Sequence, residues 1–386
     1  MKIISVVGAR PNFMKIAPFC QAISIYNESH KEDVIENVLV HTGQHYDVCM
    51  SDAFFHELNI PDPDINLEVG SGSHAEQVGH TMIAFEKVLI QEKPDWVVVV
   101  GDVNATLSCS VTAKKLNIKV CHIEAGLRSG DTTMPEEINR LVTDRLADLL
   151  LTPDTISSEN LRKEGVIERK IAFVGNIMID TMDKNIEKAA ILDIGDLIFR
   201  NLAKGCSLND QVPVDNKYAI VTLHRPSNVD KQDIFEPLLN FLLSEVAPEY
   251  AIIWPIHPRT RKQIEKFGLL EQMIANKNLT LLEPVGYHDM LRLNLGSRII
   301  LTDSGGIQEE CCVLGKPCIT LRWNTERPVT LIENGGVSVL VGNNINMLRQ
   351  QYYEILKMNI KPRRPELWDG NAAERCVKAI VNSHIQ

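Results

Sequence analysis

The sequence predicts an α/β protein built from two Rossmann-like, doubly wound domains. Short runs rich in Val, Ile and Leu alternate with amphipathic stretches, which is the pattern of parallel sheets covered by helices. This alternation occurs in two successive series, and 386 residues exceed the size at which a single hydrophobic core stops growing. We therefore expect two domains whose strand ends face each other across a cleft.

The first series predicts six strands, which are Ile3–Val7, Val38–His41, Trp96–Val100, Lys119–Ile123, Leu149–Thr152 and Ile171–Val174. Between about Asp183 and Asn216 the strand signals stop, and charged residues with Gly195, Gly205 and Pro213 predict a linker helix and a connection. The second series then predicts six more strands, which are Tyr218–Leu223, Ala251–Ile256, Thr280–Leu282, Arg298–Thr302, Pro317–Leu321 and Val337–Val341.

Domain boundaries follow from these patterns. The first domain is expected over residues 1–180, the connection over 181–216 and the second domain over 217–365. Helical patterns at Ile307–Leu314 and Met347–Met358 belong to the second domain. Residues 366–386 contain the amphipathic run Ala372–Val381, which we expect to form a helix that returns to the first domain.

Composition limits the classes of function. The chain has 50 Asp and Glu against 40 Lys and Arg, without a block of like charge, which argues against a nucleic-acid partner. Nine cysteines without a Cys-x-x-Cys pair signal neither a zinc site nor a disulfide framework. The chain opens directly on a strand, and its apolar runs are too short to span a bilayer, so we expect a soluble cytoplasmic protein and no membrane partner.

Carboxylates follow two neighbouring predicted strands. Asp102 ends the run from Trp96 and Glu124 ends the run from Lys119, while Glu136 and Glu137 open the next helical stretch. In a parallel sheet the carboxyl ends of neighbouring strands form the ligand crevice, so these residues are candidate acid and base groups. The structural alternative is that each carboxylate caps the helix that follows it.

The loop Gly8–Lys15 follows the first predicted strand and offers Arg10 and Lys15 as anion contacts, although both could instead be exposed surface residues. The loop lacks the P-loop pattern and the dinucleotide Gly-x-Gly-x-x-Gly pattern, so ATP and nicotinamide chemistry are not indicated.

The loop Thr302–Glu310 joins a strand to a helix in the second domain. Ser304 is a predicted N-cap, and Gly305 and Gly306 let backbone N–H groups approach a phosphate or diphosphate at the helix terminus. Glu309 or Glu310, one turn later, could accept hydrogen bonds from ribose hydroxyls, or could simply place negative charge near the helix N-terminus.

Histidines follow two strands of the second domain. His224 and His257 each stand in a loop with an arginine, which suggests contacts to a phosphorylated ligand. His41 and His45 have the spacing of a metal pair, but Gly43 interrupts the helix that such a pair requires and no Glu follows His41. We therefore expect no metal site.

Together these loops resemble the non-hydrolysing UDP-N-acetylglucosamine 2-epimerases. The resemblance covers nearly the whole chain and rests on eight ordered motifs, which are Gly8–Lys15, His41–Asp47, Gly101–Thr106, His122–Ser129, Met134–Arg140, Leu223–Asn228, Thr302–Glu310 and Asn324–Pro328. It implies a GT-B fold, a homodimer, a UDP-sugar substrate, and no metal or redox cofactor.

The resemblance also implies roles for individual residues. The catalytic set comprises Asp102, Glu124, Glu136 and His224. The diphosphate contacts comprise Arg10, Lys15, Ser304, Gly305 and Gly306, and Glu310 is the ribose contact. Where better-known members carry an aromatic residue near uracil, this chain has Met290, and Tyr287 is the other candidate to contact the base.

The implied reaction inverts C2 of UDP-N-acetylglucosamine to give UDP-N-acetylmannosamine. Removal of the C2 proton and departure of UDP would give a 2-acetamidoglucal, to which UDP and a proton return on the other face. Such a route needs acid and base groups on both faces of the sugar. The alternatives are a 2-epimerase of a modified UDP-sugar, a hydrolysing 2-epimerase, a GT-B glycosyltransferase and a non-catalytic nucleotide-sugar sensor.

Overall fold

The computed structural model describes residues 1–8, 10–43, 57–58, 60–206 and 213–385, and the chain divides into two compact units. Unit 1 comprises Met1–Lys184 and Pro365–Gln386, and unit 2 comprises Asn185–Arg364. The division lies close to the expected boundaries at 180 and 365. Most of the expected connection, however, falls in unit 2.

Unit 1 contains a seven-stranded parallel sheet with the order β3-β2-β1-β4-β5-β6-β7. Its strands are β1 (Lys2–Val7), β2 (Glu36–His41), β3 (Ile65–Asn66), β4 (Trp96–Val100), β5 (Lys119–Ile123), β6 (Leu149–Thr152) and β7 (Ile171–Phe173). The six strands predicted for this unit are confirmed. The two-residue strand β3 was not predicted, because so short an edge strand carries no periodicity of its own.

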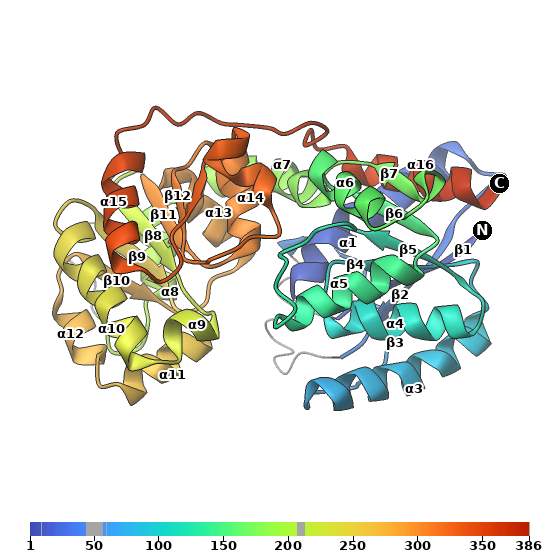
Figure 1. The fold of residues 1–386 in the computed structure, drawn as a ribbon, viewed down its shortest axis with the longest axis horizontal. Helices are drawn as coiled ribbons and strands as arrows, with labels where there is room; N and C mark the ends of the chain where they lie inside the picture. The colour runs from blue at the N-terminus through green and yellow to red at the C-terminus, as the bar shows by residue number, and fades with distance from the viewer. Residues whose placement is uncertain (9, 44–56, 59, 207–212, 386) are drawn as a thin grey trace. The chain divides into compact units, whose positions relative to one another are not determined.

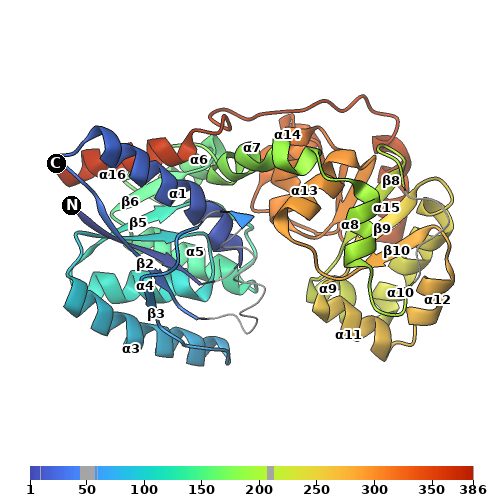
Figure 2. The ribbon, with the colours of Figure 1, turned by 180° about the vertical axis from the view of Figure 1, so that it is seen from behind.

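Helices cover both faces of this sheet (Figures 1 and 2). On one face α3 and α5 pack against α4, and on the other α16, red in the figures, packs against α1. The helices of unit 1 are α1 (Arg10–Ser29), α3 (His74–Glu92), α4 (Asn104–Lys115), α5 (Pro135–Leu146), α6 (Thr155–Lys163), the 3-10 turn η1 (Glu168–Lys170), α7 (Ile177–Ala190), which continues into unit 2, and α16 (Ala372–Ile385).

Unit 2 contains a six-stranded parallel sheet with the order β10-β9-β8-β11-β12-β13. Its strands are β8 (Tyr218–Thr222), β9 (Ala251–Pro255), β10 (Leu279–Leu282), β11 (Ile299–Thr302), β12 (Cys318–Thr320) and β13 (Ser338–Leu340). All six were predicted, and their ends differ from the prediction by one residue at most. Both sheets thus have the doubly wound topology expected from the sequence.

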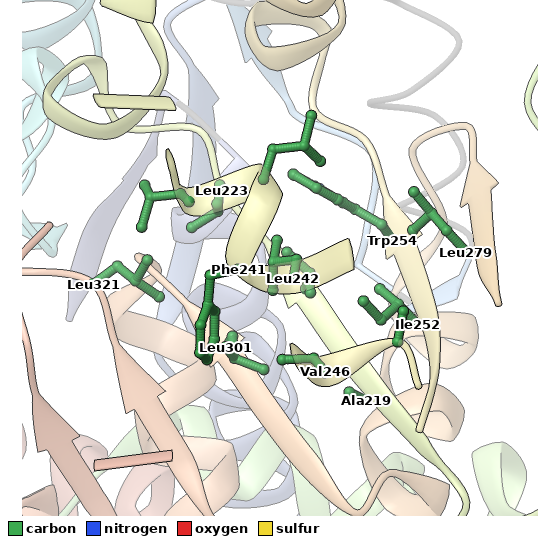
Figure 3. Close-up of a cluster of buried hydrophobic side chains, with 14 of the residues drawn as sticks. Ala219, Leu223, Phe241, Leu242, Val246, Ile252, Trp254, Leu279, Leu301 and Leu321 are labelled. Atoms are coloured by element: carbon green, nitrogen blue, oxygen red, sulfur yellow. The ribbon is translucent and has the colours of Figure 1, made fainter. Parts of the chain in front are cut away.

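The helices of unit 2 form two layers with separate cores. The first core lies under α10, α11, α12 and α15 and includes Trp254, Phe241 and Leu242 (Figure 3), while the second lies under α8, α13 and α14. The helical elements are α8 (Ile194–Asn201), α9 (Pro226–Val229), α10 (Gln232–Phe241), η2 (Leu242–Val246), α11 (Pro258–Lys266), α12 (Leu270–Ala275), α13 (Tyr287–Gly296), α14 (Gly305–Leu314), η3 (Pro328–Thr330), η4 (Ile332–Asn334) and α15 (Ile345–Ile355).

The order of the strands explains where ligands are expected. In unit 1 the direction of winding reverses between β1 and β4, and in unit 2 it reverses between β8 and β11. Ligands of doubly wound sheets bind at the carboxyl ends of the strands at such a reversal. The segments that follow these four strands contain Gly8, Lys15, Asp102, His224 and Ser304–Gly306, of which Lys15 lies in the first helix and Gly305 and Gly306 begin α14.

The C-terminal helix packs on unit 1, as predicted. The carboxylate of Asp180 accepts the backbone N–H groups of Ala372 and Ala373 at 3.1 and 2.7 Å and thereby caps α16. Upstream of the helix, the Trp368 indole donates to the carbonyl of Pro153 at 2.9 Å. Among the described residues, no helix combines the length and apolar character needed to cross a membrane.

Gly175→Ala should loosen the attachment of α16. Gly175 has φ +88°, and a Cβ there would lie 2.1 Å from the carbonyl oxygen of Leu367, so alanine has to displace backbone. Gly165→Ala is a matched control, because Gly165 has φ +81° and open space around a Cβ. The control should cost only the left-handed penalty of about 1–2 kcal/mol.

Hydrogen exchange of the peptide 365–386 measures the difference between the two variants. We expect faster exchange in Gly175→Ala than in Gly165→Ala. Equal protection of α16 in both variants would contradict this account.

Candidate active-site residues

The carboxylate cluster of unit 1 consists of Lys15, Asp102, Glu124 and Arg140. Asp102 and Glu124 follow the paired strands β4 and β5, in which Val100 stands opposite Ile123. Their side chains are 23% and 4% exposed, respectively. Carboxylates so far removed from water require compensating partners, and the structure supplies one for each.

Glu124 forms an ion pair with Lys15, and both side chains are buried. Gly101 lies against this pair, since a Cβ there would be 3.0 Å from Lys15 Nζ and 3.3 Å from Glu124 Oε2. The structure thus places Lys15 in contact with a carboxylate, and its expected contact with a diphosphate stays a prediction. This pairing keeps a negative charge buried at the end of β5.

Glu124 also has an unusual backbone conformation. Its φ is +73°, in the left-handed region, which costs a residue other than glycine about 1–3 kcal/mol. The N–H groups of Glu124 and Ala125 both donate to the carbonyl of Leu151 at 3.0 Å and hold the turn. Such strain often marks functional positions, and here it fixes the direction of the Glu124 side chain.

Asp102 is held by Arg140, a residue that the sequence reasoning missed. Arg140 is 1% exposed, donates to Asp102 at 3.1 Å through Nε, and is also paired with Glu137. Glu137 accepts the N–H groups of Ser129 and Gly130, each at 3.0 Å, so its role is to hold that loop. Its neighbour Glu136 is exposed, which leaves Glu136 as the accessible carboxylate of the pair.

The side chain of Arg10, which begins α1, lies outside what the structure describes. His45 also lies outside the described residues, so the structure cannot be used to examine the His41–His45 spacing that the sequence analysis set aside as a metal pair. Within the part of the chain that is described, no group of three or more His, Cys, Asp or Glu side chains is arranged to hold a metal ion.

The histidine cluster of unit 2 consists of His224, His257 and Asp303. His224 follows β8 and Asp303 follows β11, and His224 Nδ1 lies 2.8 Å from Asp303 Oδ1. The His224 and His257 rings are 5.3 Å apart between centroids. His257 is exposed at the N-terminus of α11, where its Nδ1 accepts the N–H of Arg259 at 3.2 Å. Two of the predicted ligand-binding residues are thus neighbours.

Asp303 organises this cluster. The carboxylate is fully buried and accepts the N–H of Arg225 at 2.9 Å and Nδ2 of Asn228 at 3.0 Å. Burial by itself would raise the pKa of Asp303, but the hydrogen bond and charge of His224 together with these donors hold the pKa below its ordinary value. An ionised Asp303 fixes the proton of His224 on Nδ1, so Nε2 is the ring nitrogen left to meet a ligand.

The glycine turn after β11 begins α14 as predicted, with Ser304 at the N-cap position, although no side-chain capping bond forms among the described residues. A Cβ at Gly305 would lie 2.7 Å from Arg327 Nη1 and 2.8 Å from Glu326 Oε1. A side chain at position 305 would therefore have to displace these paired charges. Gly306 follows within the first turn of α14, where backbone N–H groups can meet an anion.

Glu309 and Glu310, the two ribose candidates, differ in their partners. Glu309 is paired with Arg327 at 2.8 Å, whereas Glu310 accepts Nδ2 of Asn294 at 2.9 Å and also contacts the Tyr287 side chain. Burial raises the pKa of Glu310 to about 7. Glu310 thus remains the better ribose candidate, since Glu309 neutralises an arginine.

Tyr287 is largely buried. The side chain is 4% exposed and contacts Glu310, and the expected contact of its ring with uracil stays a prediction. Met290, one turn later on α13, is only partly buried and packs against the second core of unit 2. Tyr287 opens a helix, and sequence position alone could not show that its ring faces inward.

Sequence reasoning missed Arg140 and Asp303 for different reasons. Asp303 follows its strand directly, as Asp102 does in unit 1, so the same position rule could have identified it. Arg140 lies in the middle of α5, far along the chain from Asp102, and no local pattern marks it as a partner.

Two doubly wound parallel sheets, each with its polar cluster at the strand ends, place the chain in the GT-B class of α/β proteins. A family model described as UDP-N-acetylglucosamine 2-epimerase matches residues 27–381. The chain belongs to this family.

Relatives of known name match along the full length. The UDP-N-acetylglucosamine 2-epimerase of Methanocaldococcus jannaschii is 41% identical over 99% of both chains. The crystal structure of that organism's enzyme with UDP-GlcNAc and UDP has a TM-score of 0.86 at 40% identity and covers 99% of this chain and 100% of its own. The UDP-2,3-diacetamido-2,3-dideoxy-D-glucuronate 2-epimerase of Pseudomonas aeruginosa is 36% identical over 99% of both chains.

Glu310→Gln should change how stability depends on pH. The folded state raises the pKa of Glu310 from 4.5 to about 7, so this residue contributes stability that is fully present below about pH 4.5 and is lost as pH rises through about 7. Glutamine does not titrate. The variant should therefore gain about 2–3 kcal/mol relative to the wild type between about pH 5 and about pH 8.

The measurement is the urea dependence of hydrogen exchange in unit 2 at the two pH values. Glu333→Gln, at an exposed position of the same unit, serves as the control and should show no such trend. A constant difference between wild type and Glu310→Gln across this range would disprove the assigned titration.

Proposed function

We propose that this protein interconverts UDP-N-acetylglucosamine and UDP-N-acetylmannosamine without hydrolysing them, as the homodimer that the family resemblance implies. The C2 proton leaves, the C1–O bond to UDP breaks, and the electrons of the C2–H bond form the C1=C2 double bond of a 2-acetamidoglucal. UDP then returns to C1 while a proton is added to C2 from the opposite face. The main support is the buried carboxylate cluster at the ends of β4 and β5 in a chain of this family.

Proton transfer is assigned to unit 1. Asp102 has a carboxylate oxygen fixed by Arg140 and remains 23% exposed, so it can reach a substrate while its orientation is held. Glu124 is held by Lys15, whose positive charge stabilises the ionised carboxylate between proton transfers. Glu136 is the exposed third carboxylate and completes the proposed set.

Binding of UDP is assigned to unit 2. His224, held by Asp303, and the first turn of α14 at Ser304–Gly306 offer donors to a diphosphate that gains negative charge as it leaves C1. His257 adds a second imidazole beside His224. Glu310 is proposed to accept a ribose hydroxyl. Arg10 is proposed to contact the diphosphate because it belongs to the motif that follows β1.

A modified sugar is the second candidate substrate. The Pseudomonas aeruginosa relative is named for a diacetamido glucuronate, and its identity of 36% is close to the 41% of the relative named for the unmodified sugar. Assaying both UDP-sugars side by side separates the two. A rate higher by about tenfold or more in kcat/KM for one sugar identifies it as the preferred substrate.

The first functional prediction concerns the C2 proton. When the protein turns over UDP-N-acetylglucosamine in deuterated water, the product should carry deuterium at C2, because the proton removed exchanges with solvent before the return step. Proton NMR of the product measures this directly. Retention of the original proton would rule out the elimination route, and free UDP formed in proportion to product would indicate a hydrolysing enzyme.

The second functional prediction separates the roles of the two clusters. Asp102→Asn and Glu124→Gln should lower turnover by about 10²-fold or more, because each removes a proposed proton-transfer group, while keeping affinity for UDP, whose binding is assigned to unit 2. His224→Ala should weaken UDP binding as well as turnover.

Steady-state rates together with calorimetric titration of UDP test these assignments. Glu86→Gln, which removes an exposed carboxylate on α3, is the matched control and should behave as wild type. If Asp102→Asn and Glu124→Gln lose UDP affinity but keep full turnover at saturation, the carboxylates position the ligand and do not transfer protons.

A further inference from the structure

His122 is a fully buried histidine that the proposed reaction does not use. It is the fourth residue of β5, where it stands opposite Val99 of β4 and Leu150 of β6, and its exposure is 0%. A histidine in the middle of a sheet needs a hydrogen-bond partner for each ring nitrogen, because water cannot reach either. The partners that it has determine its charge.

Both ring nitrogens of His122 face acceptors. Nε2 lies 2.8 Å from the carbonyl oxygen of Gly101, and Nδ1 lies 2.6 Å from Oδ1 of Asp144. A carbonyl oxygen can only accept, so Nε2 must be protonated. Asp144 also accepts the N–H of Gly126 at 3.0 Å and Nη1 of Arg128 at 2.7 Å on its other oxygen.

Asp144 is an ionised carboxylate in this arrangement. Burial would raise its pKa, but the charge and hydrogen bond of His122, together with Arg128, hold the pKa below its ordinary value. Nδ1 of His122 therefore carries the proton of their shared hydrogen bond, and the ring is an imidazolium. Beyond Asp144 the charges continue to alternate, since Arg128 is paired with Glu164 at 2.7 Å near the surface.

This network joins the turns that carry the two proton-transfer candidates. On one side His122 fixes the carbonyl of Gly101, the residue directly before Asp102. On the other side Asp144 fixes the N–H of Gly126, two residues after Glu124. Gly101 also lies against the Lys15–Glu124 pair, so the His122 ring sets how the ends of β4 and β5 stand relative to each other.

We propose that His122 is a positioning residue whose doubly protonated ring links the Asp102 turn to the Glu124 turn and so sets the geometry for proton transfer at C2. The effect of His122 on catalysis rests on the proposed function, whereas the protonation of its ring does not. An imidazole that lost its proton would leave a buried nitrogen facing Asp144 without a donor between them.

Nitrogen-15 NMR of the histidine-labelled wild-type protein tests the charge without reference to activity. We expect two ring N–H signals for His122 at neutral pH, one for each acceptor that its ring nitrogens face. Nuclear Overhauser contacts to Gly101 and Asp144 identify these signals, so the test does not depend on a variant that folds. A single ring N–H for His122 would overturn the proposal.

Kinetics of His122→Gln test the positioning role. Glutamine can donate to the Gly101 carbonyl but carries no charge and cannot bridge to Asp144 at the same time. We expect kcat to fall by about 10- to 100-fold, while the Kd for UDP, assigned to unit 2, changes by less than about twofold. His30→Gln, at an exposed histidine beyond the end of α1, is the control.

The outcomes separate the two proposals. Unchanged kcat in a folded His122→Gln protein, or equal losses of kcat and of UDP affinity, would refute the positioning role. A wild-type protein that epimerises neither UDP-sugar would refute the proposed function, and the NMR result would still decide the charge of His122.

Discussion

Buried carboxylates at the ends of parallel strands require cations, and this requirement organises both units. Each of the carboxylates Glu124, Asp102 and Asp303 has a cationic or ionisable partner, namely Lys15, Arg140 and His224. Removing one member of the buried Lys15–Glu124 pair would leave an uncompensated buried charge, which costs several kcal/mol. The loops that carry these residues are therefore fixed by charge pairing as much as by the sheets beneath them.

The same constraint explains why glycine is needed at particular positions. At Gly101 a side chain would meet the Lys15–Glu124 pair, and at Gly305 it would meet Arg327 and Glu326. Charged groups can approach the backbone closely only where no Cβ intervenes. In the second case the glycine of a phosphate-type turn also serves an internal ion pair, so its presence in the sequence does not by itself show that a ligand binds there.

The two units differ in the chemistry that their clusters can perform. The cluster in unit 1 is dominated by carboxylates held by cations, which suits proton transfer. The cluster in unit 2 combines imidazoles with a helix N-terminus, which suits an anion. Fold alone does not distinguish an epimerase from other GT-B proteins. The roles that we propose for the two clusters therefore rest on the residues at the strand ends. A network of paired charges also runs from His122 through Asp144 and Arg128 to Glu164, and the sequence motif did not reveal it.

The sequence by itself determined the strands, their division into two sheets, the returning C-terminal helix and the loops where the polar residues gather, because hydrophobic periodicity and strand-end position are local properties. Only the tertiary structure decided the partners. It paired Lys15 with Glu124, 109 residues apart, turned Glu137 inward while leaving Glu136 exposed, and buried the ring of Tyr287. Partners and burial depend on packing between segments far apart in the chain, and no local pattern encodes which of two adjacent side chains meets a distant charge.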